Sequence, residues 1–254
     1  MERDCFRFVR MCHQCQIHSE LIHSPPSELY PMSAPWPFVS RGVDGISPIE
    51  PKTSNGHRFI LVAIYYFTKW VEAITLKAVT KKEVIDFVQS NIICRFGIPK
   101  IIITDNAANL NSHLMKEVCE QFKTEHRNST PYRPKANGPV EAANKNIKKI
   151  LRKMVQGPGE LHEKLLFALL GYQITICTSV GATPYLFVYG TKAVIPAEVE
   201  IPSLPIIVQA GIEDTEWVNS RLEQLSLIEE KCLAAVCICQ LYKQRMACTY
   251  NKKV

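Results

Sequence analysis

Two acidic residues stand where a carboxylate can do chemistry, one at the end of a predicted strand and one at the start of a predicted helix. Ile101 to Thr104 is a β-branched run typical of a buried strand, and Asp105 follows it directly. A carboxylate at a strand end points into a cleft. Asn137-Gly138-Pro139 is a helix start signal, which puts Glu141 in the first turn of the helix that follows.

The helix that carries Glu141 has one apolar and one basic face. Its apolar residues recur every three or four positions, which predicts packing against a core. From Asn144 to Lys153 the chain has five Lys or Arg residues and no Asp or Glu. A basic ridge of this kind suits phosphate groups, although many basic helix faces are simply solvated. Glu141 alone could equally favour the helix dipole, and Asp105 with Asn106 could merely form a turn.

Asp105 and Glu141 have 35 residues between them, and this arrangement resembles the catalytic core of retroviral and retrotransposon integrases. The gypsy class of long-terminal-repeat retrotransposons is the most similar. The acidic triad of that family ends in an Asp and a Glu at this interval, and its first acid lies upstream. Asp44, in Arg41-Gly-Val-Asp-Gly-Ile-Ser-Pro, stands at this first position, in a short apolar strand where an Asp is otherwise disfavoured.

The resemblance implies a metal-dependent transfer of DNA phosphodiesters, with Asp44, Asp105 and Glu141 as catalytic residues and metal ligands. Two divalent ions about 3.5 to 4 Å apart can activate the attacking oxygen, stabilise the leaving oxygen and offset the phosphate charge. Mg²⁺, or Mn²⁺ in its place, suits such carboxylate oxygens. Asp105 and Glu141 would each hold one ion, and Asp44 would bridge them. The implied reactions are 3′-end processing by water and strand transfer by the freed 3′-hydroxyl.

The resemblance also implies the partners. DNA, both the element's ends and the target, would contact the helix face and the loop before it, and the expected residues are Lys145, Lys148, Lys149, Arg152, Tyr132 and Asn137. We further expect a homo-oligomer located in the nucleus. A membrane is not expected, because the longest apolar run, Phe59 to Phe67, has nine residues against the roughly 18 that a membrane span needs. The N-terminal residues also lack the apolar region of a signal peptide.

For the fold, the resemblance implies an α/β, ribonuclease-H-like domain: a mixed five-stranded sheet flanked by helices, with a helical C-terminal extension. Strands are predicted around Asp44 and at 57–66, 70–76, 101–104 and 125–128, and a capping box at Thr80 starts a helix before Asp105. The expected domains are a zinc-domain remnant with its linker at 1–30, the integrase catalytic core at 31–200 and the helical extension at 201–254.

Cys12 and Cys15 have the spacing of one half of a tetrahedral zinc site. In integrases that resemble this chain, two upstream histidines complete the site, and only 11 residues precede Cys12. We therefore expect an unmetallated remnant, with His13, His18 and His23 as the nearby residues that zinc would have to recruit.

The chain departs from the family pattern at several positions. Arg41 stands where Trp is common, Tyr65 where Asp is common, and Ala107 where Gly usually follows Asp-Asn, which would strain the backbone if that position has a positive φ. These departures suggest a truncated, decaying copy. Two alternatives to an active integrase remain open: a degenerate nucleic-acid-binding remnant without catalysis, and a ribonuclease-H-type nuclease.

Overall fold

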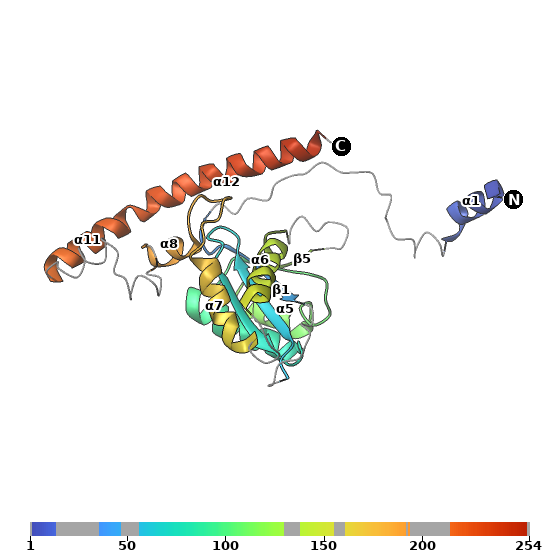
Figure 1. The fold of residues 1–254 in the computed structure, drawn as a ribbon. Coiled ribbons are helices and arrows are strands. Elements are labelled where there is room, and N and C mark those ends of the chain that lie inside the picture. Colours follow the sequence, from blue (N-terminus) through green and yellow to red (C-terminus); the bar gives the residue numbers. More distant parts are fainter. Residues whose placement is uncertain are drawn as a thin grey trace.

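The computed structural model describes residues 2–13, 36–46, 56–129, 138–154, 161–191, 193 and 214–252. Its centre is one five-stranded sheet with the strand order β3-β2-β1-β4-β5 (Figure 1). The strands are β1 (Ser40–Ile46), β2 (Phe59–Tyr65), β3 (Val71–Leu76), β4 (Ile101–Thr104) and β5 (Glu125–Asn128). β1, β2 and β3 pair in antiparallel fashion, whereas β4 runs parallel to both β1 and β5. The predicted mixed sheet is confirmed.

Helices precede, connect and follow these strands. The helices up to β5 are α1 (Glu2–Met11), α3 (Lys81–Phe87), the π-helical segment η1 (Val88–Ile93), α4 (Cys94–Phe96) and α5 (His113–Gln121). The helices after β5 are α6 (Gly138–Met154), α7 (Leu161–Gln173), α8 (Pro184–Tyr189), α11 (Asp214–Ser226) and α12 (Ile228–Asn251). Local signals fix two of the starts. Thr80 and Glu83 form the predicted capping box at α3, and the Ser112 side chain accepts a hydrogen bond from the Met115 N–H at α5.

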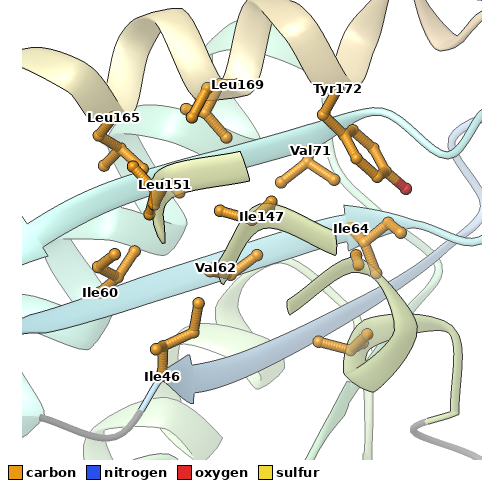
Figure 2. Packing of buried hydrophobic residues seen from close by; sticks show 14 of the residues in the cluster. Ile46, Ile60, Val62, Ile64, Val71, Ile147, Leu151, Leu165, Leu169 and Tyr172 are labelled. Carbon is orange, nitrogen blue, oxygen red and sulfur yellow. The ribbon is translucent and has the colours of Figure 1, made fainter. Parts of the chain in front are cut away.

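Both faces of the sheet are covered by helices, which is why β2 is apolar along its whole length. Side chains of alternate β2 residues point to opposite faces. Ile60, Val62 and Ile64 join α6 and α7 in one cluster (Figure 2), and Leu61 and Ala63 join α3, η1 and α5 in another. The sheet is therefore the middle layer of three, and α6 is held against it by a continuous core.

The same alternation divides β1. Ile46 belongs to the cluster under α6 and α7, and Val43 belongs to the cluster on the other face. Gly42 and Asp44, which share the parity of Ile46, thus face α6, whereas Arg41 faces the opposite side. One short strand therefore presents an acid to α6 and a buried cation to α4.

Arg41 is buried against the ring of Tyr65 at the start of β1. Its side chain is fully buried, and its guanidinium lies 4.1 Å from the centre of the Tyr65 ring. Nη2 donates to the Phe96 carbonyl at 3.4 Å, while Nε and Nη1 have no hydrogen-bond partner in the described part of the chain. The two departures at positions 41 and 65 are thus directly opposite each other in the β1–β2 register.

The C-terminal helices extend from the domain and pack on it through a small third cluster, in which Cys232 and Ala235 of α12 meet Phe67, Val180 and Phe187. Figure 1 shows α11 and α12 running past α8 on one side of the sheet. In the ranges that the structure describes, none of the helices is both long and apolar enough to cross a membrane.

Candidate active site

The parallel pairing of β1 with β4 brings Asp44 and Asp105 together. In this register Val43 is opposite Thr104; the next residue of the chain is Asp44, still within β1, in one case and Asp105, just after β4, in the other. Adjacent strands lie roughly 5 Å apart, so the two acids lie side by side. The sheet order thus places the strand of Asp44 directly beside the strand that leads to Asp105.

Glu141 approaches the same place from α6. It lies in the first turn of that helix, as its sequence position predicts, and its side chain is exposed. The apolar stripe of α6, including Val140, Ala143 and Ile147, is buried against the sheet. This packing holds the first turn of α6 above β1, and with it Glu141 above Asp44.

A surface cavity of about 730 Å³ opens between β1 and α6. Asp44 and Glu141 line it together with a row of polar and basic residues from α6: Asn144, Lys145, Lys148, Lys149, Arg152 and Lys153. All four of the α6 residues predicted to contact DNA are in this lining. Two carboxylates are therefore located at the end of a strongly basic cavity wall.

Asn144, which was not among the predicted site residues, links β1 to α6. Its Nδ2 donates a hydrogen bond of 2.9 Å to Asp44 Oδ2, across 100 positions in the chain. Its side chain is buried, and its Oδ1 has no hydrogen-bond partner among the described residues. A polar residue within the apolar stripe of α6, four positions after Val140 and three before Ile147, was the signal that could have found it.

The environment of Asp44 disfavours its charge. Burial, together with the negative charges of Asp105 and Glu141, raises the pKa of Asp44 to about 6, although the Gly45 N–H and Lys148 act in the opposite direction. The Gly45 N–H donates to Asp44 Oδ1 at 2.8 Å. All three predicted acids are thus coupled through space at one end of the sheet. A site that concentrates like charges in this way is suited to binding a cation.

Comparison with known proteins agrees with this geometry. Residues 43–134 match the family described as the integrase core domain. This segment of the chain is therefore similar to integrase core domains. It runs from Val43, within β1, to beyond the end of β5, with Asp44 and Asp105 inside it and Glu141 seven residues beyond its end.

Similarity to curated proteins extends past the integrase core segment. The chain is 29% identical over 195 residues to uncharacterized protein K02A2.6 of Caenorhabditis elegans, covering 76% of this chain and 15% of that protein. It is 26% identical to the Pro-Pol polyprotein of simian foamy virus type 3 (91% of this chain, 19% of the polyprotein). It is also 26% identical to the transposon Tf2-3 polyprotein of Schizosaccharomyces pombe (77% and 15%). The chain thus spans less than a fifth of the length of these relatives.

The fold also matches a solved structure. A chain in the cryo-EM structure of the simian T-cell lymphotropic virus intasome in complex with PP2A regulatory subunit B56 gamma aligns with a TM-score of 0.55 and 22% identity, over 73% of this chain and 66% of that one. The predicted ribonuclease-H-like fold of the integrase core is confirmed.

The loop after β4 positions Asp105 without strain. Asp105 is half-buried, and its Oδ1 accepts a hydrogen bond of 3.1 Å from the Ala107 N–H, which closes a tight turn. Ala107 is not among the described non-glycine residues with a positive φ. Alanine at position 107 therefore does not impose the positive-φ backbone strain that the missing glycine suggested. Asp105 is not part of the cavity lining, so it reaches Asp44 from the side of the neighbouring strand.

The chemistry of these side chains fits a divalent cation. The three acids offer only hard oxygen ligands, and the buried Oδ1 of Asn144, beside Asp44, is a further oxygen that has no hydrogen-bond partner among the residues described. Across the described ranges, no three His, Cys, Asp or Glu side chains are close enough to form a metal cluster as they stand. The fold thus brings the three acids to the same end of the sheet, but their carboxylates are not close enough together to coordinate one ion as they stand.

Three predicted site residues, Cys15, Tyr132 and Asn137, lie outside the described residues, as do His18 and His23. Cys12 is half-buried just after α1, where its N–H donates to the Phe8 carbonyl at 2.8 Å. The zinc-remnant hypothesis therefore stays a prediction.

Proposed function

We propose that this chain is a polynucleotidyl transferase of the integrase type, from a gypsy-class retrotransposon, that cuts and joins DNA strands at the end of β1. The observation that carries the proposal is the cavity between β1 and α6, which has Asp44 and Glu141 at one end and five basic residues along its wall. Carboxylates alone would repel DNA. A row of cations beside them attracts the phosphate backbone and leaves the acids free to act on one phosphodiester.

The proposed roles follow from position. Lys145 and Lys148, one and two turns after Glu141, bind phosphates next to the acids, and Lys149 and Arg152 extend this contact along α6. Asn144 holds the Asp44 carboxylate through its 2.9 Å hydrogen bond and so keeps one acid fixed while DNA moves past. Because the pKa of Asp44 is about 6, its carboxylate is mostly ionised at pH 7.5 and available as a ligand.

Asp44, Asp105 and Glu141 are the residues that would hold Mg²⁺ or Mn²⁺. Such ions, when bound, would activate the attacking oxygen and offset the charge on the phosphate and leaving oxygen. The protein's own contribution is to hold three acids from distant segments at one place. The basic wall orients the phosphodiester against them.

A disintegration assay tests the proposal, because it needs only a branched DNA that mimics the joined product. The chain, the Glu141→Gln variant and the control Glu120→Gln are compared with Mg²⁺ and with Mn²⁺. Glu120 is an exposed acid on α5 and is not part of the cavity lining. We expect joined product from the wild type and the control, and a drop of about 100-fold or more with Glu141→Gln, because a ligand needed in the transition state is lost.

Equal signal from wild type and Glu141→Gln would refute the proposal and leave a nucleic-acid-binding remnant. Cleavage of the DNA without strand joining would instead support the ribonuclease-H-type nuclease.

A further inference from the structure

Tyr66 lies beside the acids, although nothing in the proposed reaction uses it. The residue follows β2, and its backbone N–H donates to the Ser40 carbonyl at 3.0 Å, at the start of β1. Its side chain is 5% exposed and belongs to the core cluster under α6 and α7. A polar hydroxyl is thus buried on the face of the sheet that carries Asp44.

The position of Gly42 shows where the Tyr66 side chain runs. A Cβ atom at Gly42 would lie 2.8 Å from Tyr66 Cε1 and 2.9 Å from its hydroxyl oxygen. The backbone of Tyr66 is anchored at Ser40, so the ring extends along β1 from position 40 to position 42, in the direction of Asp44. Asp44 is two residues further on the same face, roughly 7 Å along the strand.

The first turn of α6 rests on the same point. The Cβ that Gly42 lacks would also lie 2.1 Å from Cγ2 of Val140, the residue before Glu141. β1, α6 and Tyr66 therefore meet at Gly42 with no room for a larger residue. The ring of Tyr66 fixes how closely the Glu141 end of α6 approaches the Asp44 strand.

The charged groups that act on the Tyr66 hydroxyl are the carboxylates of Asp44 and Glu141. Burial, then the negative charges of Asp44 and Glu141, raise the pKa of Tyr66 above its usual value. A phenol hydroxyl is a hydrogen-bond donor at neutral pH, and a hydrogen bond from a hydroxyl to a carboxylate is among the stronger kinds.

We propose that Tyr66 is a positioning residue for the acids: its ring seats the first turn of α6 on Gly42, and its hydroxyl donates a hydrogen bond to the Asp44 carboxylate, which keeps it beside Glu141 in the arrangement that would bind divalent ions. This inference rests on the proposed function, because it assigns Tyr66 a role in the same site. Tyr66 would act through the carboxylates and would not touch the DNA.

The test removes only the hydroxyl, with Tyr66→Phe, and compares it with Tyr65→Phe. Tyr65 is the adjacent residue in the chain and is also fully buried, but it belongs to the opposite face, where its hydroxyl has no partner among the described residues. Mn²⁺ binding to each protein is measured by calorimetry at pH 7.5, and thermal unfolding without metal checks that each variant folds. Strand joining in the disintegration assay is measured alongside.

We expect Tyr66→Phe to weaken Mn²⁺ binding by about 10-fold, the size of effect typical for residues that orient metal ligands. We expect kcat for joining to fall by a similar factor, with KM for DNA changed less than about twofold, since Tyr66 does not contact DNA. Tyr65→Phe should match the wild type in both. A purely structural role for Tyr66 would lower its melting temperature and leave the Mn²⁺ affinity of the folded protein unchanged.

Equal Mn²⁺ affinity in wild type and Tyr66→Phe would overturn the inference while leaving the proposed function standing. A similar loss with Tyr65→Phe would also overturn it, because the effect would then belong to tyrosine burial in general. Absence of Mn²⁺ binding by the wild type would instead defeat the metal-dependent function itself, and the inference with it.

Discussion

Two charged residues three positions apart on β1, Asp44 and Arg41, both lie in surroundings that disfavour a charge. Burial lowers the pKa of Arg41 to about 10 and raises that of Asp44 to about 6. The two side chains differ in what surrounds their charged groups. Asp44 opens onto a basic cavity, where Lys148 already offsets part of its charge and Asn144 satisfies one oxygen. Arg41 is fully buried, with the Tyr65 ring and the Phe96 carbonyl as its contacts and two of its nitrogens lacking partners among the described residues.

The free-energy cost of burying a charge can therefore serve ligand binding in one place and only reduce stability in another. A poorly accommodated charge next to an open cavity can be relieved by a ligand, so its cost in the free protein is recovered on binding. A fully buried charge has no such route. The family departures at Arg41 and Tyr65 therefore burden the fold, and they do so on the face of the sheet that does not carry the acids.

Removal of the enclosed charge should give the largest effect on stability. We expect Arg41→Met to raise the free energy of unfolding by about 2 kcal/mol, because an incompletely paired buried cation is replaced by an apolar side chain of similar length. Urea denaturation measures this, with Arg58→Met, a half-buried arginine at the start of β2, as the control. A decrease in stability with Arg41→Met would mean that the contacts of the guanidinium stabilise it more than its burial costs.

The contribution of Asp44 to the free energy of unfolding should depend on pH. Because the pKa of Asp44 is raised in the folded protein, the folded state binds more protons than the unfolded state between about pH 4 and pH 6. The contribution of Asp44 to stability is therefore greatest below that window and is lost as pH rises through about 6. We expect the loss to be about 1 to 2 kcal/mol, discounted for partial exposure to water.

Asp44→Asn isolates this contribution. The difference in unfolding free energy between the variant and the wild type should grow in favour of the variant from pH 4 to pH 7, and stay constant above that. A difference that does not change with pH would show that Asp44 has an ordinary pKa and that the acids do not interact.

The basic wall should give the smallest effect. Lys148→Gln is expected to weaken binding of a short DNA duplex about threefold and to reduce the slope of log K against log salt by about 1, as for the loss of one phosphate contact. Lys77→Gln, an exposed lysine after β3, is the matched control. Identical salt slopes for all three proteins would remove Lys148 from the DNA surface.

Much of the fold was predictable because its signals are local. β4 and β5 have the predicted bounds, and the capping box at Thr80 starts α3 as predicted. The π-helical segment from Val88 to Ile93 was not predicted, since hydrophobic spacing does not distinguish it from a regular helix.

The candidate site was predictable only in part. The family resemblance identified the three acids. The parallel pairing of β1 with β4, which brings two of them together, agrees with the fold that the resemblance implies. The hydrogen bond from Asn144 to Asp44 and the contact of Gly42 with Tyr66 and Val140 depend on how α6 lies across β1, with partners up to 100 positions apart. No local pattern specifies such contacts. The burial of Arg41 likewise depends on which face of β1 meets α4.

The central claim is that acids from β1, the loop after β4 and α6 form one cation site. Its most direct test is urea denaturation with and without Mn²⁺, for the wild type and for Asp44→Asn, Asp105→Asn and Glu141→Gln. At a Mn²⁺ concentration 100-fold above its dissociation constant, we predict that the wild type gains about 2.7 kcal/mol. Each of the three variants is predicted to lose most of that gain. Gains in all three variants as large as that of the wild type would contradict the account.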